Sequence, residues 1–266
     1  MPKTLQEIVM KVETDPDWVG EGNVDQAIKR LQTKGSGLGI DLRVMDGEQL
    51  ALSRMSYGKD SDFSTTSLWV PNDHLYGNTK EADILVVDKK HSLIFRSPEK
   101  ATSAHARAFW SMKGREFGVK GDYDRLRQLA SPDASEALKT GVLSLSRASY
   151  RRDTTAFKHE FGVQHIDTDS FGDNNLTVFI FGEETAANYG RWLKEEEKAR
   201  DIVHFVVGGA EAAKQREPFA RALWVHKLAV GQMYLDGVYP NLANHYGLVR
   251  GVKHVPAERA APQAPQ

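Results

Sequence analysis

Two short apolar runs, separated by a segment with helical spacing, dominate the second half of the chain. Residues 176–182 are apolar and end in glycine, and residues 202–209 repeat this pattern and end in two glycines. Residues 183–198, between them, begin with acidic residues and carry apolar side chains at helical intervals. This order predicts a strand, a helix and a second strand, joined as a right-handed crossover of a parallel sheet. Ligands of such sheets bind beyond the carboxyl ends of the strands, where the glycines stand.

The first half of the chain shows alternating apolar and polar positions around turn signals. Residues 40–52 alternate about Asp46-Gly47, a pair typical of a two-residue hairpin turn, and residues 84–95 predict a second hairpin. Residues 63–80 are polar, contain Pro, Asn and Gly, and predict a long loop. Capping residues and apolar spacing predict helices at residues 5–13, 24–34, 98–112, 122–130 and 132–140.

These elements predict an α+β N-terminal region with antiparallel hairpins, followed by an α/β parallel-sheet domain. Apolar runs at residues 142–145 and 163–166 add two strands to the second domain. We place the first domain at residues 1–135 and the second at residues 136–254. Residues 255–266 are rich in Pro, Ala and Gln and predict a disordered tail.

Composition narrows the classes of chemistry that the chain can support. The 266 residues carry a formal net charge of −1 and include no cysteine. The lack of cysteine excludes disulfides, thiolate zinc sites and cysteine nucleophiles. The apolar runs are too short to span a membrane, and the N-terminus lacks the apolar core of a signal peptide. We therefore expect a cytoplasmic protein without a membrane partner.

The C-terminal quarter of the chain resembles a known enzyme family. Residues 200–211 resemble the penultimate strand and Gly-Gly loop of SPOUT (trefoil-knot) methyltransferases, in particular of the group that methylates a pseudouridine in ribosomal RNA. Residues 223–228 resemble the last strand and histidine-containing loop of this family. Residues 232–234 resemble its final helix, and residues 244–246 resemble its C-terminal histidine/tyrosine motif. Over residues 176–247, the resemblance implies a SPOUT-like α/β domain.

The resemblance also implies an activity, a cofactor and partners. The activity would be S-adenosylmethionine-dependent methylation of RNA, carried out by a homodimer. His245 or Tyr246 would orient the acceptor or take its proton. The main chain around seven residues would hold S-adenosylmethionine: Phe181, Gly182, Gly208, Gly209, Leu223, His226 and Leu228.

A cluster of basic residues supports nucleic-acid binding independently of the resemblance. Arg147, Arg151, Arg152 and Lys158 lie close together in the chain and are interleaved with Tyr150 and Phe157. Cationic side chains bind phosphates, and aromatic rings stack on bases. A solvated, charged helix face would show the same pattern. The cluster is thus a candidate contact for RNA.

Two other functions remain open. A binding or structural protein with a degenerate α/β pocket would explain Ala212 and Gly247, which replace a glycine and a histidine of the SPOUT pattern. Alternatively, His165 and Asp167 form an H-x-D triplet at a predicted strand end. With His204 as third ligand they would bind Fe(II) in a 2-oxoglutarate oxygenase.

Overall fold

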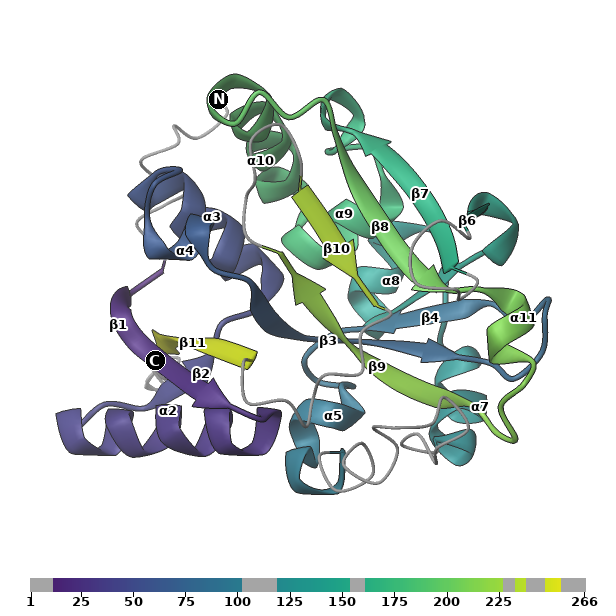
Figure 1. The fold of residues 1–266 in the computed structure, drawn as a ribbon, viewed down its shortest axis with the longest axis horizontal. Helices are drawn as coiled ribbons and strands as arrows, with labels where there is room; N and C mark the ends of the chain where they lie inside the picture. The colour runs from purple at the N-terminus through teal and green to yellow at the C-terminus, as the bar shows by residue number, and fades with distance from the viewer. Residues whose placement is uncertain (1–11, 102–118, 154–160, 227–232, 238–246, 255–266) are drawn as a thin grey trace, which may run out of the picture.

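The computed structural model describes residues 12–101, 119–153, 161–226, 233–237 and 247–254. These segments form a large mixed sheet, a small antiparallel sheet and the helices that flank them (Figure 1). In spatial order the large sheet contains β5 (Val142–Leu145), β4 (Ile84–Val87), β3 (Leu68–Tyr76), β9 (Phe219–Val225), β10 (Met233–Asp236), β8 (Asp201–Val207), β7 (Phe161–Asp167) and β6 (Arg151–Asp153).

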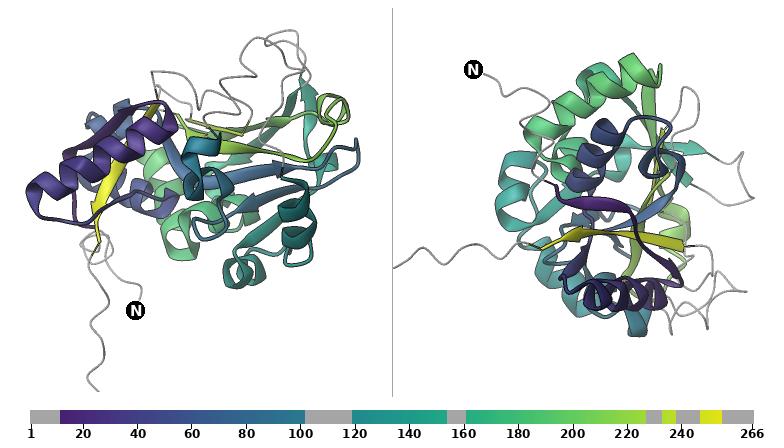
Figure 2. Two further views of the ribbon diagram at one scale, coloured as in Figure 1. Left: turned by 90° about the horizontal axis from the view of Figure 1, so that it is seen from below. Right: turned by 90° about the vertical axis from the view of Figure 1, so that its left-hand side faces the viewer.

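The small sheet brings the first and last described strands together. Its order is β1 (Thr14–Gly22), β11 (Gly247–Lys253) and β2 (Leu42–Val44). Helix α2 (Val24–Leu38) packs alongside β1 and β11, as Figure 2 shows. The side chain of Asn23 accepts a hydrogen bond from Gln26 N–H and caps this helix, so the predicted start is confirmed. The helix ends at Gly39, a few residues beyond the predicted end.

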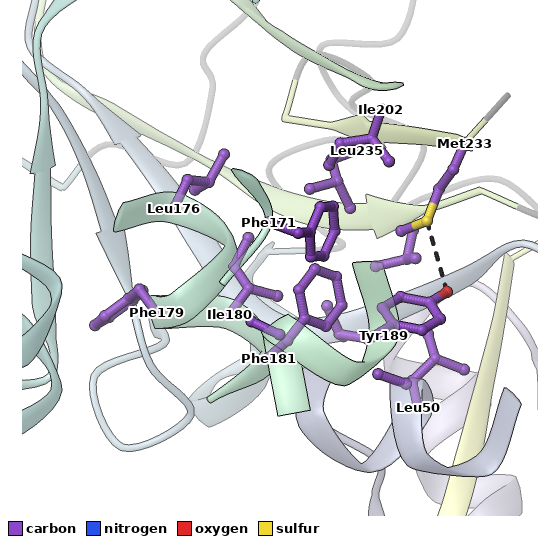
Figure 3. Packing of buried hydrophobic residues seen from close by; sticks show 14 of the residues in the cluster. Leu50, Phe171, Leu176, Phe179, Ile180, Phe181, Tyr189, Ile202, Met233 and Leu235 are labelled. Atoms are coloured by element: carbon purple, nitrogen blue, oxygen red, sulfur yellow. Dashed lines mark hydrogen bonds between the residues drawn. The ribbon is translucent and has the colours of Figure 1, made fainter. Parts of the chain in front are cut away.

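Helices cover both faces of the large sheet. The main hydrophobic core lies between one face and four helices: α3 (Gly47–Tyr57), α8 (Ala134–Thr140), α9 (Asn175–Phe181) and α10 (Glu183–Glu196). Figure 3 shows aromatic rings from α9 and α10 at its centre. A second core joins the other face to α2 and to α5 (Leu93–Arg96) and α7 (Lys120–Arg127). The remaining short elements are α4 (Asp62–Thr65), η1 (Arg147–Ser149), η2 (Thr168–Ser170) and α11 (Gly209–Ala212).

Several predicted elements are confirmed where local signals were strong. Residues 183–196 form α10, and residues 201–207 form β8. The strands predicted at 84–87, 142–145 and 163–166 are β4, β5 and part of β7. Much of the helices predicted at 5–13 and 98–112, and all of the predicted tail at 255–266, lie outside the described residues.

The predicted parallel crossover is wrong. Residues 175–181 form α9, because the side chain of Asn174 accepts from the N–H groups of Leu176 and Thr177 and caps a helix. A short, fully apolar run cannot be assigned to strand or helix by periodicity alone. Strand β8 pairs antiparallel with β7 and parallel with β10, so the sheet is mixed rather than a SPOUT-like parallel sheet.

Both predicted hairpins and the predicted loop are also corrected. Asp46 does not begin a turn but forms a capping box with Gln49 at the start of α3. The second half of the other predicted hairpin is helix α5. The loop predicted at 63–80 contains β3, a central and wholly buried strand. Its register shifts between Val70 and Asp73, which places the intervening proline in a bulge, where proline is tolerated.

The large sheet is continuous across the predicted domain boundary. Strand β4 lies before residue 135 and β5 lies after it, yet the two pair along their whole length, from Ile84↔Leu145 to Val87↔Val142. Strand β3 likewise pairs with β9. The boundary predicted between residues 135 and 136 lies within α8, strands from both sides of it pair in one sheet, and the division into two domains stays a prediction.

A buried carboxylate joins the large sheet to helix α5. Asp73 of β3 is fully buried and accepts hydrogen bonds from the Ser92 hydroxyl and from the N–H groups of Leu93 and Ile94. Burial raises the pKa of Asp73 to about 6, because desolvation outweighs the opposing effect of these hydrogen bonds. Between pH 3.8 and about pH 6, Asp73 therefore keeps a proton in the folded protein that it would release in the unfolded chain.

Replacing Asp73 with asparagine is expected to change the pH dependence of stability. Because the pKa of Asp73 is raised on folding, this residue stabilises the folded protein fully below the unfolded pKa of 3.8. This stabilisation is lost as the pH rises through 6. Urea unfolding should show the wild type losing about 2 to 3 kcal/mol relative to Asp73→Asn between about pH 4 and pH 7. Parallel pH profiles for the two proteins would contradict this assignment.

Candidate functional site

Two buried histidines from distant strands meet inside the curled sheet. His74 of β3 and His204 of β8 lie with their Nε2 atoms 2.9 Å apart, although β9 and β10 separate their strands. Both side chains are completely buried. The hydroxyl of Tyr150 lies 2.8 Å from Nδ1 of His204, so the three side chains form one hydrogen-bonded chain. Because β3 and β8 are not neighbours, this contact requires the curl of the sheet.

The side chains of His74, His204 and Tyr150 are neutral near pH 7. Burial lowers the pKa of His74 to about 3. Burial also lowers the pKa of His204 well below its usual value, and the neighbouring His74 acts in the same direction. Burial raises the pKa of the Tyr150 phenol. None of the three therefore changes its charge near neutral pH.

A pocket with a volume of about 70 Å³ lies beside this cluster, at the end of β8. Its wall combines basic, aromatic and small apolar residues. The lining residues are Arg147, Tyr150, Arg152, Phe161, Gly162, Val206, Val207, Gly208 and Gly209.

Arg147 holds three segments together at the edge of the pocket. Its Nη1 donates to Val207 O at 2.7 Å and its Nη2 to Gly77 O at 3.2 Å, while its Nε donates to Ala82 O. Its guanidinium also lies 5.5 Å from the centre of the Tyr76 ring. Desolvation lowers the pKa of this half-buried cation. Within the described residues, no carboxylate lies within ion-pair distance of it.

The predicted RNA-binding arginines do not form one exposed cluster. Arg147 is half-buried and bonded to main-chain carbonyls, whereas Arg151 and Arg152 lie exposed in β6. Lys158 lies outside the described residues. RNA binding and a homodimer stay predictions.

The residues predicted to hold S-adenosylmethionine are dispersed. Of the seven, the structure places Gly208 and Gly209 at the pocket. A Cβ on Gly209 would lie 2.7 Å from Lys80 O, so close packing accounts for this glycine. Phe181 is buried in the main core, and Gly182 links α9 to α10 at a φ of 79°.

The remaining predicted site residues lie elsewhere or outside the described segments. Leu223 is buried in β9, and Nε2 of His226 lies 3.6 Å from the carboxylate of Asp236. Met233 and Tyr234, predicted to belong to the final helix, lie in strand β10. Three further residues of the predicted site lie outside the described residues: Leu228, His245 and Tyr246.

The predicted iron triad is not assembled. Gln164 pairs with His204 across β7 and β8, so the alternation of side chains directs His165 to the opposite face. The His165 side chain is 62% exposed and binds Asp201, with its Nδ1 2.6 Å from the carboxylate. Among the described residues there is no group of three or more His, Asp or Glu side chains suited to a metal. The oxygenase interpretation is therefore wrong.

Sequence reasoning missed His74 and the partnership of Tyr150 with His204. His74 lies in the segment predicted as a loop, and its partner is 130 positions away in the chain. Nothing local to either residue indicates the contact. The residues around His74, from Asp73 to Gly77, lack the sustained alternation of apolar and polar residues that is typical of a strand.

Comparisons with known proteins give a likeness of fold. No family model and no curated protein matches the chain. The chain is similar to one solved structure. The description of that structure is "Accommodation of massive sequence variation in Nanoarchaeota by the C-type lectin fold". The two share 14% sequence identity with a TM-score of 0.51, over 91% of this chain and 96% of the other. No helix in the described segments is long and apolar enough to cross a bilayer.

This likeness corrects the SPOUT interpretation. The solved structure has a C-type lectin fold and matches nearly the whole length of this chain. The large sheet also lacks the parallel strand order of the methyltransferases. The predicted methyltransferase and the predicted degenerate pocket of a parallel α/β domain are therefore both wrong. At this level of identity the similarity shows the fold alone, and that fold is the C-type lectin fold.

Proposed function

We propose that this protein is a binding protein that recognises its ligand without transforming it. The observation that carries the proposal is the state of the titratable side chains beside the pocket. His74 and His204 are neutral, fully buried and bonded to each other, and Tyr150 is bonded to His204. General acid–base catalysis needs a group whose pKa lies near the working pH. These three groups have been moved away from that range by burial.

The buried ionic groups around the sheet support the same proposal. Arg54 and Arg147 donate to main-chain carbonyls, and Asp73 accepts from main-chain N–H groups. Such bonds stabilise the scaffold whatever side chains the surface carries. The fold of the similar chain is described as accommodating massive sequence variation, which is the property expected of a scaffold for recognition.

The proposal predicts a ligand that stabilises the protein and is recovered unchanged. A thermal-shift panel of small anionic, neutral and saccharide ligands should contain at least one that raises the Tm, because a ligand that binds only the folded state stabilises it. NMR of that ligand after prolonged incubation should show no product. Turnover of a stabilising ligand, or a panel without any stabilising ligand, would count against a binding function.

A further inference from the structure

We propose that the pocket beside Arg147 and Tyr150 binds a carboxylate group carried on a small apolar body. The proposal rests on the binding function above and names the class of ligand. It follows from three features of the pocket: a guanidinium with no carboxylate within ion-pair distance among the described residues, a hydroxyl available as a donor, and an apolar wall.

The positive charge belongs to Arg147. A guanidinium has five N–H donors, and each of the three nitrogens of Arg147 makes one hydrogen bond to a main-chain carbonyl. This leaves one N–H on each terminal nitrogen, which matches the two oxygens of a carboxylate. Carbonyl dipoles solvate the cation in part but do not neutralise it. An anion in the pocket would supply the missing charge.

The donor is the hydroxyl of Tyr150, and the histidine pair decides its orientation. If Tyr150 donated to Nδ1 of His204, then His204 would donate to His74. His74 would carry its remaining proton on Nδ1, which is buried and without a hydrogen-bond partner in the described structure. An unsatisfied buried N–H is costly. In the opposite direction, Nε2–H of His74 donates to Nε2 of His204, and Nδ1–H of His204 donates to the Tyr150 oxygen. This arrangement leaves only the lone pair on Nδ1 of His74 without a partner.

This direction frees the proton of Tyr150 for another acceptor. Tyr150 is half-buried and lines the pocket, so water or a ligand can reach it, whereas His74 is sealed from both. The histidine pair therefore acts as a neutral support that holds the phenol as a donor toward the pocket. A carboxylate oxygen is a suitable acceptor, because hydrogen bonds to charged groups are the stronger ones.

The apolar wall selects the rest of the ligand. Phe161, Val206 and Val207 line the pocket, and each is less than a tenth exposed. The cavity volume, about 70 Å³, lies well below the range for drug-sized ligands, which begins at about 300 Å³, so the pocket suits a small ligand only. These features favour a compact aryl or alkyl carboxylate over a fully hydrated anion such as inorganic phosphate.

The test is an NMR titration of the full chain with benzoate, benzamide and inorganic phosphate. Benzoate is expected to shift the amide signals of Gly208 and Gly209 and to saturate. Benzamide, which has the same shape without the charge, should bind at least about tenfold more weakly. Equal binding of benzamide, stronger binding of phosphate, or no benzoate binding at about 10 mM would overturn the proposal.

Variants separate the site from the scaffold. Tyr150→Phe is expected to weaken benzoate binding about tenfold, because it removes one hydrogen bond to a charged group. Arg151→Gln, at an exposed neighbouring position outside the pocket, should leave the affinity unchanged. An unaltered affinity of a folded Tyr150→Phe would overturn the role of the phenol. If that variant fails to fold, the comparison of benzoate with benzamide on the wild type decides the question.

The two proposals can fail separately. If another ligand of the thermal-shift panel binds and is recovered unchanged, but benzoate does not bind, the carboxylate proposal is wrong and the proposed binding function still holds. Conversion of benzoate into a product would remove the binding function itself.

Discussion

Replacing Arg54 with methionine is expected to lower the free energy of unfolding by about 4 kcal/mol. Arg54 is fully buried and joins α3 to three distant segments. Its Nε donates to Phe63 O at 2.8 Å, its Nη1 to the Tyr189 hydroxyl at 3.0 Å and its Nη2 to His226 O at 2.8 Å. Methionine fills much of the same volume but leaves these acceptors buried without donors.

The expected loss is large because domains of this kind are stabilised by only about 5 to 15 kcal/mol. Urea unfolding followed by tryptophan fluorescence measures it directly. The control is Arg43→Met, since Arg43 is 59% exposed and its ion pair with Asp41 lies at the surface. That change should alter stability by no more than about 0.5 kcal/mol. An Arg54→Met protein as stable as the control variant would show that the buried bonds contribute little.

Acidification is expected to destabilise the protein through the histidine pair. The folded pKa values of His74 and His204 lie below the unfolded value of 6.5. As the pH falls below 6.5, these two histidines are protonated first in the unfolded chain, which favours unfolding. The stabilisation is fully present above this pH and is lost below it. Each group contributes up to about 1.4 kcal/mol per pH unit, so the pair should cost about 3 kcal/mol between about pH 6.5 and pH 5.

Asp73 opposes this trend. Its raised pKa adds stability as the pH falls through 6, which offsets about 1.4 kcal/mol of the loss by pH 5. The decisive comparison is therefore between the wild type and the double variant His74→Leu with His204→Leu. The double variant should lose about 3 kcal/mol less between about pH 6.5 and 5.

The matched control for this experiment is Leu38→Ala, at a side chain that is 56% exposed and does not titrate. Its unfolding free energy should follow the same pH profile as that of the wild type between about pH 6.5 and 5. A double variant with an unchanged acid dependence would show that the buried pair does not govern this behaviour.

The parts of the fold that the sequence predicted correctly are those with a local cause. Asn23 caps α2 through its own side chain, and Gly141 ends α8 with a φ of 77°. Both effects involve atoms within a few residues of each other, so they follow from the order of amino acids alone. The runs that became β4 and β8 are rich in β-branched residues, which favour strands in any context.

The errors arose where burial outweighed local preference. The apolar run that became α9 has the composition of a strand, but its capped start and complete burial among helices favour a helix. Strand β3 carries Pro71, Asn72 and Asp73, which are typical of a loop. A bulge accommodates the proline, the Asn72 amide donates a hydrogen bond to Val87 O of β4, and Asp73 accepts hydrogen bonds from N–H groups of α5.

The candidate site could not be predicted for the same reason. Its chemistry depends on His74 and His204, which are 130 residues apart and meet through the curl of a sheet whose strand order does not follow the chain. The predicted Gly208 and Gly209 do line the pocket, because glycines at the end of a strand allow close packing of the main chain.

The sequence by itself determined where α2 and α10 start, that the apolar runs at residues 84–87 and 202–207 form strands, and that thiol chemistry is excluded. Capping, apolar patterning and composition are properties of short segments or of the whole set of residues, and they need no knowledge of neighbours in space. Only the tertiary structure decided which strands pair, which histidines lose their charge and what lines the pocket. Those outcomes depend on contacts between residues far apart in the chain, where desolvation and hydrogen bonding outweigh local propensity.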